Sequence, residues 1–248
     1  MQIWLKNSLI FILSGETNKN KKLITMKKLA FILMSLATSF TFAQVSKDLG
    51  DFDNVRVFDR INVELIPAAE NKIEINGKRS EEVEVVNRNG ELKIRMKFGK
   101  LLKGDDITAK LYFKKIEGVD ASEGSYIVSD ATFKQTSFEI IAKEGAEIRL
   151  SLNVSKAKVK SVTGGIVRIQ GSADNQEASL GTGGVLEAAD LKTTQTTVSI
   201  TTGGEADVRA TELVDAKVRA GGTITIYGSP KQINKKTVLG GDIVESKQ

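Results

Sequence analysis

The sequence predicts an all-β fold: a parallel β-solenoid (β-helix) with coils of about 19 residues, preceded by a β-rich amino-terminal half with at least one hairpin. Three observations lead to this prediction. Glycine recurs at a nearly constant spacing, apolar residues follow each glycine at fixed offsets, and no 3.6-residue apolar period appears in the repeats. Helical repeats and leucine-rich repeats are therefore poorer interpretations.

The glycine period runs through the second half of the chain. Successive landmark glycines are separated by 21, 19, 19, 20, 18 and 19 residues; they are Gly124, Gly145, Gly164, Gly183, Gly203, Gly221 and Gly240. Each of the last five landmark glycines is followed directly by a second glycine, whereas Gly124 and Gly145 are not. Glycine accepts a positive φ and allows the close approach of a neighbouring backbone, so these pairs indicate tight corners between strands.

The apolar positions indicate which side chains face the interior. The third residue after each landmark is apolar throughout: Ile127, Ile148, Val167, Leu186, Ala206, Ile224 and Ile243. Side chains two apart on a strand share a face, so the intervening residues should form an outward column: Arg149, Arg168, Glu187, Asp207 and Thr225. A second alternating pair precedes the glycines, as in Ile140 with Ala142, which predicts two strands per coil.

Residues 51–118 also have β character, with longer polar side chains and several chain reversals. Alternation is clear at Val55 and Val57 and again at Leu92 and Ile94. The dipeptide Asn89-Gly90 predicts a hairpin, because both residues accept positive φ. The pattern leaves open whether this half caps the solenoid or forms its early coils.

The domain organisation that we expect has five segments. Residues 1–25 are an upstream extension, 26–43 a signal peptide, 44–50 a linker, 51–118 the amino-terminal β region and 119–248 the solenoid. Lys27 and Lys28 precede an apolar run, and small residues stand at Thr41 and Ala43, so we expect export and cleavage after Ala43. An uncut anchor is less favoured because the run is short for a bilayer. Whether translation starts at Met1 or Met26 stays open.

The overall charge argues against a nucleic-acid partner. The chain has a formal net charge of +5, but six of its 36 basic and one of its 31 acidic residues lie in residues 1–43. Cleavage after Ala43 would leave 30 of each, without the basic excess that phosphate binding requires. We also expect no stable membrane span after cleavage. One basic cluster, which could form a contact loop, consists of Lys97, Lys100 and Lys103 around Phe98 and Leu101. Two acids follow it directly, Asp105 and Asp106, so a mixed surface loop is favoured.

The sequence assigns no catalytic, cofactor-binding or metal-binding residue. It contains no histidine and no cysteine, which removes the commonest general base and the commonest metal ligands. We therefore expect a protein that is not an enzyme and has no cofactor. The alternative is a carbohydrate-active enzyme, a polysaccharide lyase or glycosidase on the same scaffold, with Glu187 and Asp207 in equivalent positions of adjacent coils and Glu205 nearby. A solvated charge column, with Arg168 opposite Glu187, is the favoured interpretation.

Other motifs are more weakly informative. The segment 181–184 resembles a phosphate-binding loop only superficially, because no lysine and no helix follow it. Thr163, Thr182 and Thr202 precede three landmark glycines, and such an array leaves ice binding as a minor alternative. Tyr126 and Tyr227 could be reachable from solvent, although both could also cover the ends of the core. The binding residues stay unknown.

The order of several segments resembles a known family. These segments are Phe52–Val57, Asn62–Leu65, Gly90–Ile94, the Gly-Gly coils, Tyr227–Pro230 and Gly240–Asp242. Over residues 51–245 the chain is similar to the autotransporter adhesin head GIN domain family. The resemblance implies an exported all-β protein of Bacteroidetes-like bacteria, located in the periplasm, at the outer surface or outside the cell. It implies an adhesin-like or structural role, with a cell-surface polysaccharide or an envelope protein as partner, and no catalytic residues to transfer. The oligomeric state stays open.

Overall fold

Strands make up nearly all the regular structure of the computed structural model, which describes residues 45–246. The upstream extension, the signal peptide and the expected cleavage after Ala43 lie outside the described residues. Within residues 45–246 the helical structure is a single 3₁₀ turn, η1 (Ser80–Glu82). No helix in this part of the chain is long and apolar enough to cross a membrane.

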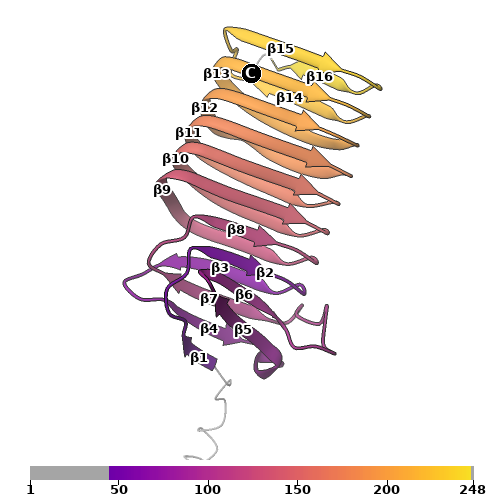
Figure 1. Cartoon of the computed structure of the whole chain (residues 1–248). Helices are drawn as coiled ribbons and strands as arrows, with labels where there is room; N and C mark the ends of the chain where they lie inside the picture. Colours follow the sequence, from indigo (N-terminus) through magenta and orange to yellow (C-terminus); the bar gives the residue numbers. More distant parts are fainter. Residues whose placement is uncertain (1–44, 247–248) are drawn as a thin grey trace, which may run out of the picture. The chain divides into compact units, whose positions relative to one another are not determined.

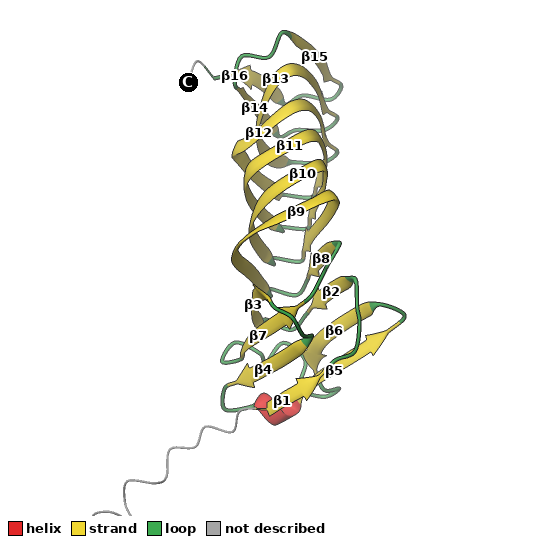
Figure 2. Ribbon diagram, turned by 90° about the vertical axis from the view of Figure 1, so that its left-hand side faces the viewer, coloured by secondary structure: helices red, strands yellow, loops and turns green. Residues whose placement is uncertain are grey.

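Five long, curved strands form the body of the solenoid, and each occupies most of one coil (Figure 1). They are β9 (Tyr126–Lys143), β10 (Glu147–Val162), β11 (Ile166–Gly181), β12 (Gly184–Ile200) and β13 (Gly204–Val218). Each pairs in parallel with the next. Turned by 90°, the same strands bend from one layer of the stack into the other (Figure 2). The predicted parallel β-solenoid is confirmed.

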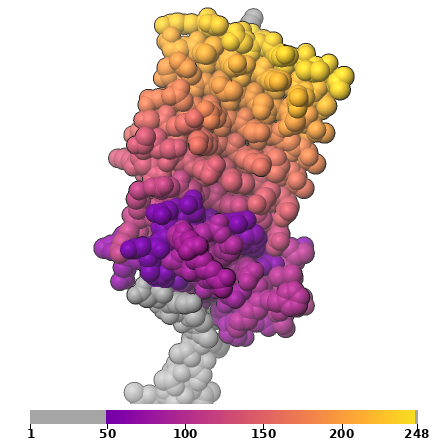
Figure 3. Space-filling model, viewed as in Figure 1, coloured from indigo at the N-terminus to yellow at the C-terminus, as the bar shows by residue number. Residues whose placement is uncertain are grey.

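The last coil is divided into shorter strands. After β13 the chain forms β14 (Thr223–Tyr227) and β15 (Gln232–Thr237), which pair in parallel with different halves of β13. The strand β16 (Asp242–Glu245) then pairs in parallel with β14. In the space-filling view the colours pass from pink through orange to yellow over the later coils, in the order in which these coils are stacked (Figure 3).

The core of the solenoid is built from columns of equivalent residues. Val167 pairs with Leu186, Leu186 with Ala206, and Ala206 with Ile224, and all four side chains are buried. The inward positions predicted from the glycine period are therefore confirmed. A second buried column lies on the other layer and contains Ile140, Val159, Ala178, Val198 and Ala216. Neither layer could bury its apolar face without the other, so the two columns together close the core.

The two glycines of each corner have different tasks. At one corner Thr163 and Gly164 both have positive φ, 52° and 71°, and reverse the chain direction. The following Gly165 is required for a different reason: a Cβ there would overlap the carbonyl group of Ala142 in the preceding coil. Backbone bonds link the corners, as where Gly164 N donates to Thr182 O at 3.1 Å. The corner is thus part of the stack rather than a loose loop.

The amino-terminal half contributes rungs to the same stack. Its parallel strands are β2 (Asn54–Val57), β3 (Asn62–Pro67), β6 (Glu91–Met96), β7 (Thr108–Phe113) and β8 (Gly118–Ala121). β2 lies between β6 and β8, and β3 lies between β7 and β9. The rung made by β2 and β3 is therefore inserted between the rung of β6 and β7 and the coil of β8 and β9.

Antiparallel strands complete this half. β4 (Lys72–Asn76) pairs with β7, β5 (Val83–Arg88) with β6, and β1 (Val45–Asp48) with β4. The β5–β6 hairpin turns at Asn89 and Gly90, both with positive φ, which confirms the predicted hairpin. Residues 45–48 belong to the segment expected to be a linker and form β1. The amino-terminal half thus contains early coils together with antiparallel strands that occupy their outer edges.

Candidate functional site

A groove of about 590 Å³ lies on the outer face of the first halves of the solenoid strands. Its floor is the outward column predicted from the sequence, because Arg149, Arg168, Glu187 and Asp207 follow one another in parallel register. Registered neighbours in such a ladder lie about 4.8 Å apart, so the four side chains form a continuous row. Two arginines thus stand next to two carboxylates along one line.

Arg168 is held by acids on both sides. Its Nε lies 2.8 Å from Glu187 Oε2, and its Nη1 forms an ion pair with Glu147 Oε1. The hydrogen bonds that Arg168 donates, first to Glu187 and then to Glu147, raise the pKa of Arg168. The pairing of Arg168 with Glu187 that we expected from the sequence is confirmed. Because the pair is partly exposed, solvent screening keeps its contribution to stability small.

Arg149 has a different environment. Its side chain is exposed on the groove floor, and within the described residues it forms no ion pair. A guanidinium group presents several N–H donors in a planar fork that matches carboxylate and sulfate groups. Arg149 is therefore the basic group of the groove that is available to an anionic ligand.

Asp207 is the acid whose environment is most unusual in the groove. Partial burial raises the pKa of Asp207, a hydrogen bond from Thr225 opposes this, and the like charges of Glu187 and Glu205 raise it further. Its registered neighbour Glu187 is tied to Arg168. No group of acids in the described residues could hold a metal ion. The groove can offer hydrogen bonds and charges of both signs to a polar ligand.

Two local insertions line the groove. In β9, residues 129–131 stand opposite a single residue of β10, and in β12, residues 189–191 have no partner in β13. These bulges contribute Asp130 and Asp190 to the lining of the groove. Sequence reasoning missed both residues. The signal was present in the glycine spacings of 21 and 20, which exceed the prevailing 19.

The remaining residues singled out from the sequence are not brought into this groove. Thr163, Thr182 and Thr202 are exposed at one corner of the coils, and the segment 181–184 is such a corner, as expected. Tyr126 is half-buried. The ring of Tyr227 is also half-buried and lies under the guanidinium group of Arg209, 5.7 Å from its centroid. This contact accounts for Tyr227 without a ligand.

Solved structures with the same fold come from Bacteroides and Parabacteroides species. A Bacteroides fragilis protein described as a "putative adhesin" has a TM-score of 0.77 and 18% identity and covers 84% of this chain and 98% of its own. A Parabacteroides distasonis "putative adhesin" has a TM-score of 0.64 at 18% identity, with the same coverage. A "putative lipid binding protein" from that species has a TM-score of 0.65 at 16% identity, again with 84% and 98% covered. At these identities the likeness shows the fold.

No curated protein matches the chain. A family model does match, over residues 51–230, which is most of the chain and nearly the whole of the described unit. The description of that family supports a binding, adhesin-like role. The chain belongs to the family described as "Putative auto-transporter adhesin, head GIN domain".

Proposed function

We propose that this protein is exported to the cell envelope and acts by binding an extended polar polymer, a cell-surface polysaccharide with acidic groups, without catalysis. The observation that carries the proposal is the groove on the solenoid face, with the unpaired Arg149 on its floor. Membership of an adhesin-like family supports a binding role. The signal peptide expected in residues 26–43 supports export.

The chemistry of the groove favours a sugar polymer over an apolar ligand. Sugar hydroxyl groups can bond to the side chains of Ser151 and Gln170, which contact each other at 2.9 Å, and to the carboxylates of Asp130 and Asp190. A uronate carboxylate or a sulfate group can pair with Arg149. The row of equivalent positions runs from coil to coil, so one extended chain can contact several of its side chains in turn.

A carbohydrate-active enzyme is the second candidate, because the pKa of Asp207 is raised as a general acid requires. A glycosidase also needs a second carboxylate in a matched role. Glu187 is the registered neighbour of Asp207 but is paired with Arg168. Binding is therefore the function that the groove supports best.

The test is a calorimetric screen of acidic and neutral polysaccharides against the chain from residue 44 onward, which contains every described strand. We expect an acidic polysaccharide to bind, and Arg149→Gln to weaken binding by about tenfold or more through the loss of a charge-assisted contact. The matched control is Arg88→Gln, which removes an exposed arginine in the β5–β6 hairpin, outside the groove. It should leave binding unchanged.

Two results would overturn the proposal. One is equal binding by the wild type and Arg149→Gln, which would place the ligand elsewhere. The other is turnover of a polysaccharide that Asp207→Asn or Glu187→Gln abolishes, which would make the protein an enzyme.

A further inference from the structure

The connection between β6 and β7, residues 97–107, exposes large apolar side chains to solvent. The exposed fraction is 97% for Phe98, 50% for Leu101 and 45% for Leu102. An exposed leucine alone would need no explanation, but three neighbouring apolar side chains, one of them an almost fully exposed phenylalanine, mark an interaction site. The groove proposed above lies on strands β9 to β13 and does not include this loop.

The backbone of this loop is held in place by a buried acid. Asp59 is 1% exposed; its Oδ1 accepts a hydrogen bond from Leu102 N at 2.8 Å, and its Oδ2 accepts one from Met96 N at 2.9 Å. The carbonyl oxygen of Asp59 accepts a third bond, from Gly104 N at 3.0 Å. The turn from Lys97 O to Lys100 N is closed at 2.9 Å. The apolar side chains are therefore presented by an ordered backbone.

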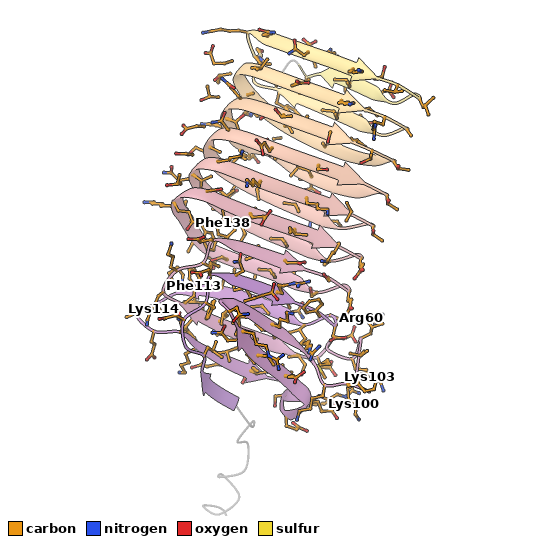
Figure 4. All side chains as sticks on the ribbon, in the orientation of Figure 1. Arg60, Lys100, Lys103, Phe113, Lys114 and Phe138 are labelled. Carbon is orange, nitrogen blue, oxygen red and sulfur yellow. The ribbon has the colours of Figure 1, made fainter. Side chains whose placement is uncertain are left out.

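Basic side chains surround the apolar ones. Lys97 Nζ donates to a backbone carbonyl, that of Glu81, rather than to a carboxylate, and Lys103 forms no ion pair within residues 45–246. Lys100 lies 3.2 Å from Glu82. Figure 4 shows Lys100 and Lys103 directed away from the strands at this end of the described unit.

Two of the four acids near the loop form ion pairs. Asp105 lies 3.4 Å from Arg60, and Glu82 is the partner of Lys100. Asp106 and the carboxylate of Glu81 are the other nearby acids. The apolar tip of the loop, Phe98 to Leu102, thus has lysines on both sides of it in the chain.

We infer that residues 97–103 form a docking loop for an anionic phospholipid bilayer. Phe98 and Leu101 enter the boundary between headgroups and acyl chains, and Lys97, Lys100 and Lys103 contact the phosphates. A bilayer surface presents apolar and negatively charged groups within a few ångströms of each other, which matches this combination. A protein partner fits less well, because a short convex loop supplies only a small part of the area of a stable protein interface.

The experiment uses tryptophan as a reporter, because the only tryptophan of the sequence is Trp4 and the chain from residue 44 onward has none. Phe98→Trp is titrated with vesicles of phosphatidylcholine containing phosphatidylglycerol, and with vesicles of phosphatidylcholine alone. The matched control is Leu239→Trp, which is also a highly exposed apolar position, 76%, but lies near the other end of the chain. Circular dichroism confirms that both variants keep the β fold.

We expect a blue shift and quenching by brominated lipid for Phe98→Trp with the anionic vesicles, and neither for Leu239→Trp. The double substitution F98S/L101S removes both apolar side chains. It should lower the vesicle-bound to free protein ratio, measured by sedimentation with anionic vesicles, by about tenfold or more. Raising the salt concentration should also release the protein, since the lysine contacts are screened. The inference is overturned if the wild type does not sediment with anionic vesicles, or if both tryptophan variants respond alike. Failure of this test would leave the polysaccharide groove untouched, because the two sites share no residue.

Discussion

Glu187 and Asp207 are registered neighbours on adjacent coils, yet only Glu187 is paired with an arginine, through Arg168 Nε at 2.8 Å. The two carboxylates therefore have different electrostatic environments on one groove floor. Asp207 has a raised pKa because of partial burial and the like charges of Glu187 and Glu205, against a hydrogen bond from Thr225. This asymmetry leads to the first prediction.

Replacing Glu187 by glutamine should lower the pKa of Asp207. The substitution removes one negative charge beside Asp207 and leaves Arg168 with one acidic partner, Glu147, instead of two, and both changes favour the ionised form of Asp207. The measurement is a titration of the side-chain carboxyl carbons by NMR. Glu139→Gln, on the other layer of the coil, should leave Asp207 unchanged, and an unchanged or raised pKa in Glu187→Gln would contradict the assignment.

The corner residue Glu123 should make stability depend on pH. Burial raises the pKa of Glu123 above its ordinary value of 4.5, and the nearby charge of Asp59 raises it further. Since the folded-state pKa is the higher one, the stabilisation is fully present below 4.5 and is lost as the pH rises through the folded-state pKa. Urea unfolding of Glu123→Gln should show a weaker decline in the free energy of unfolding over this range. A decline as steep as that of the wild type would show that other groups cause it.

A core substitution tests the stacked column. Leu186→Ala should lower the free energy of unfolding by about 2 to 5 kcal/mol, because Leu186 is 1% exposed between Val167 and Ala206 and its loss leaves a cavity. Val185→Ala, on the outward face of the same strand, should cost less than about 1 kcal/mol. The two values come from chemical denaturation monitored by circular dichroism. Similar costs for both variants would be inconsistent with the inward column.

The corner glycines should differ in their tolerance of alanine. Gly183 has φ +74° and no atom within 4 Å of an added Cβ, so Gly183→Ala should cost about 1 to 2 kcal/mol from the backbone conformation alone. At Gly184 an added Cβ would overlap the carbonyl group of Ser161 in the preceding coil. Thermal unfolding should therefore show a larger loss of stability for Gly184→Ala than for Gly183→Ala. The reverse order would mean that coil spacing does not depend on the second glycine.

The period of the sequence predicts the register of the solenoid well, because each coil must return equivalent side chains to the same column. Val167, Leu186 and Ala206 are stacked as their offsets from the glycines require. The bulges at 129–131 and 189–191 were not predicted. Their extra residues lengthen a coil without marking where in the coil they fall, so the hollow between them could not be placed from spacing alone.

The order of the amino-terminal rungs also could not be predicted from the sequence pattern. Val55, Leu92 and Val119 belong to strands with the same alternation, and nothing in that alternation selects which strand lies between the other two. The surface position of Phe98 agrees with the mixed surface loop expected from the sequence, but its almost complete exposure could not be predicted. An aromatic residue in a loop more often packs against the core, and Phe98 is 97% exposed.

The strands β2 and β3 lie between strands that follow them in the chain, which affects the order in which the protein can fold. Coils from β9 onward can be added one at a time as the polypeptide lengthens, each on a finished template. The first rung in sequence has no such template, since β2 finds its two neighbours only after β6 and β8 have been made. Loop closure over this separation is slow relative to local zipping. Assembly of the amino-terminal end is therefore expected to set the pace of folding, and the later coils to follow quickly.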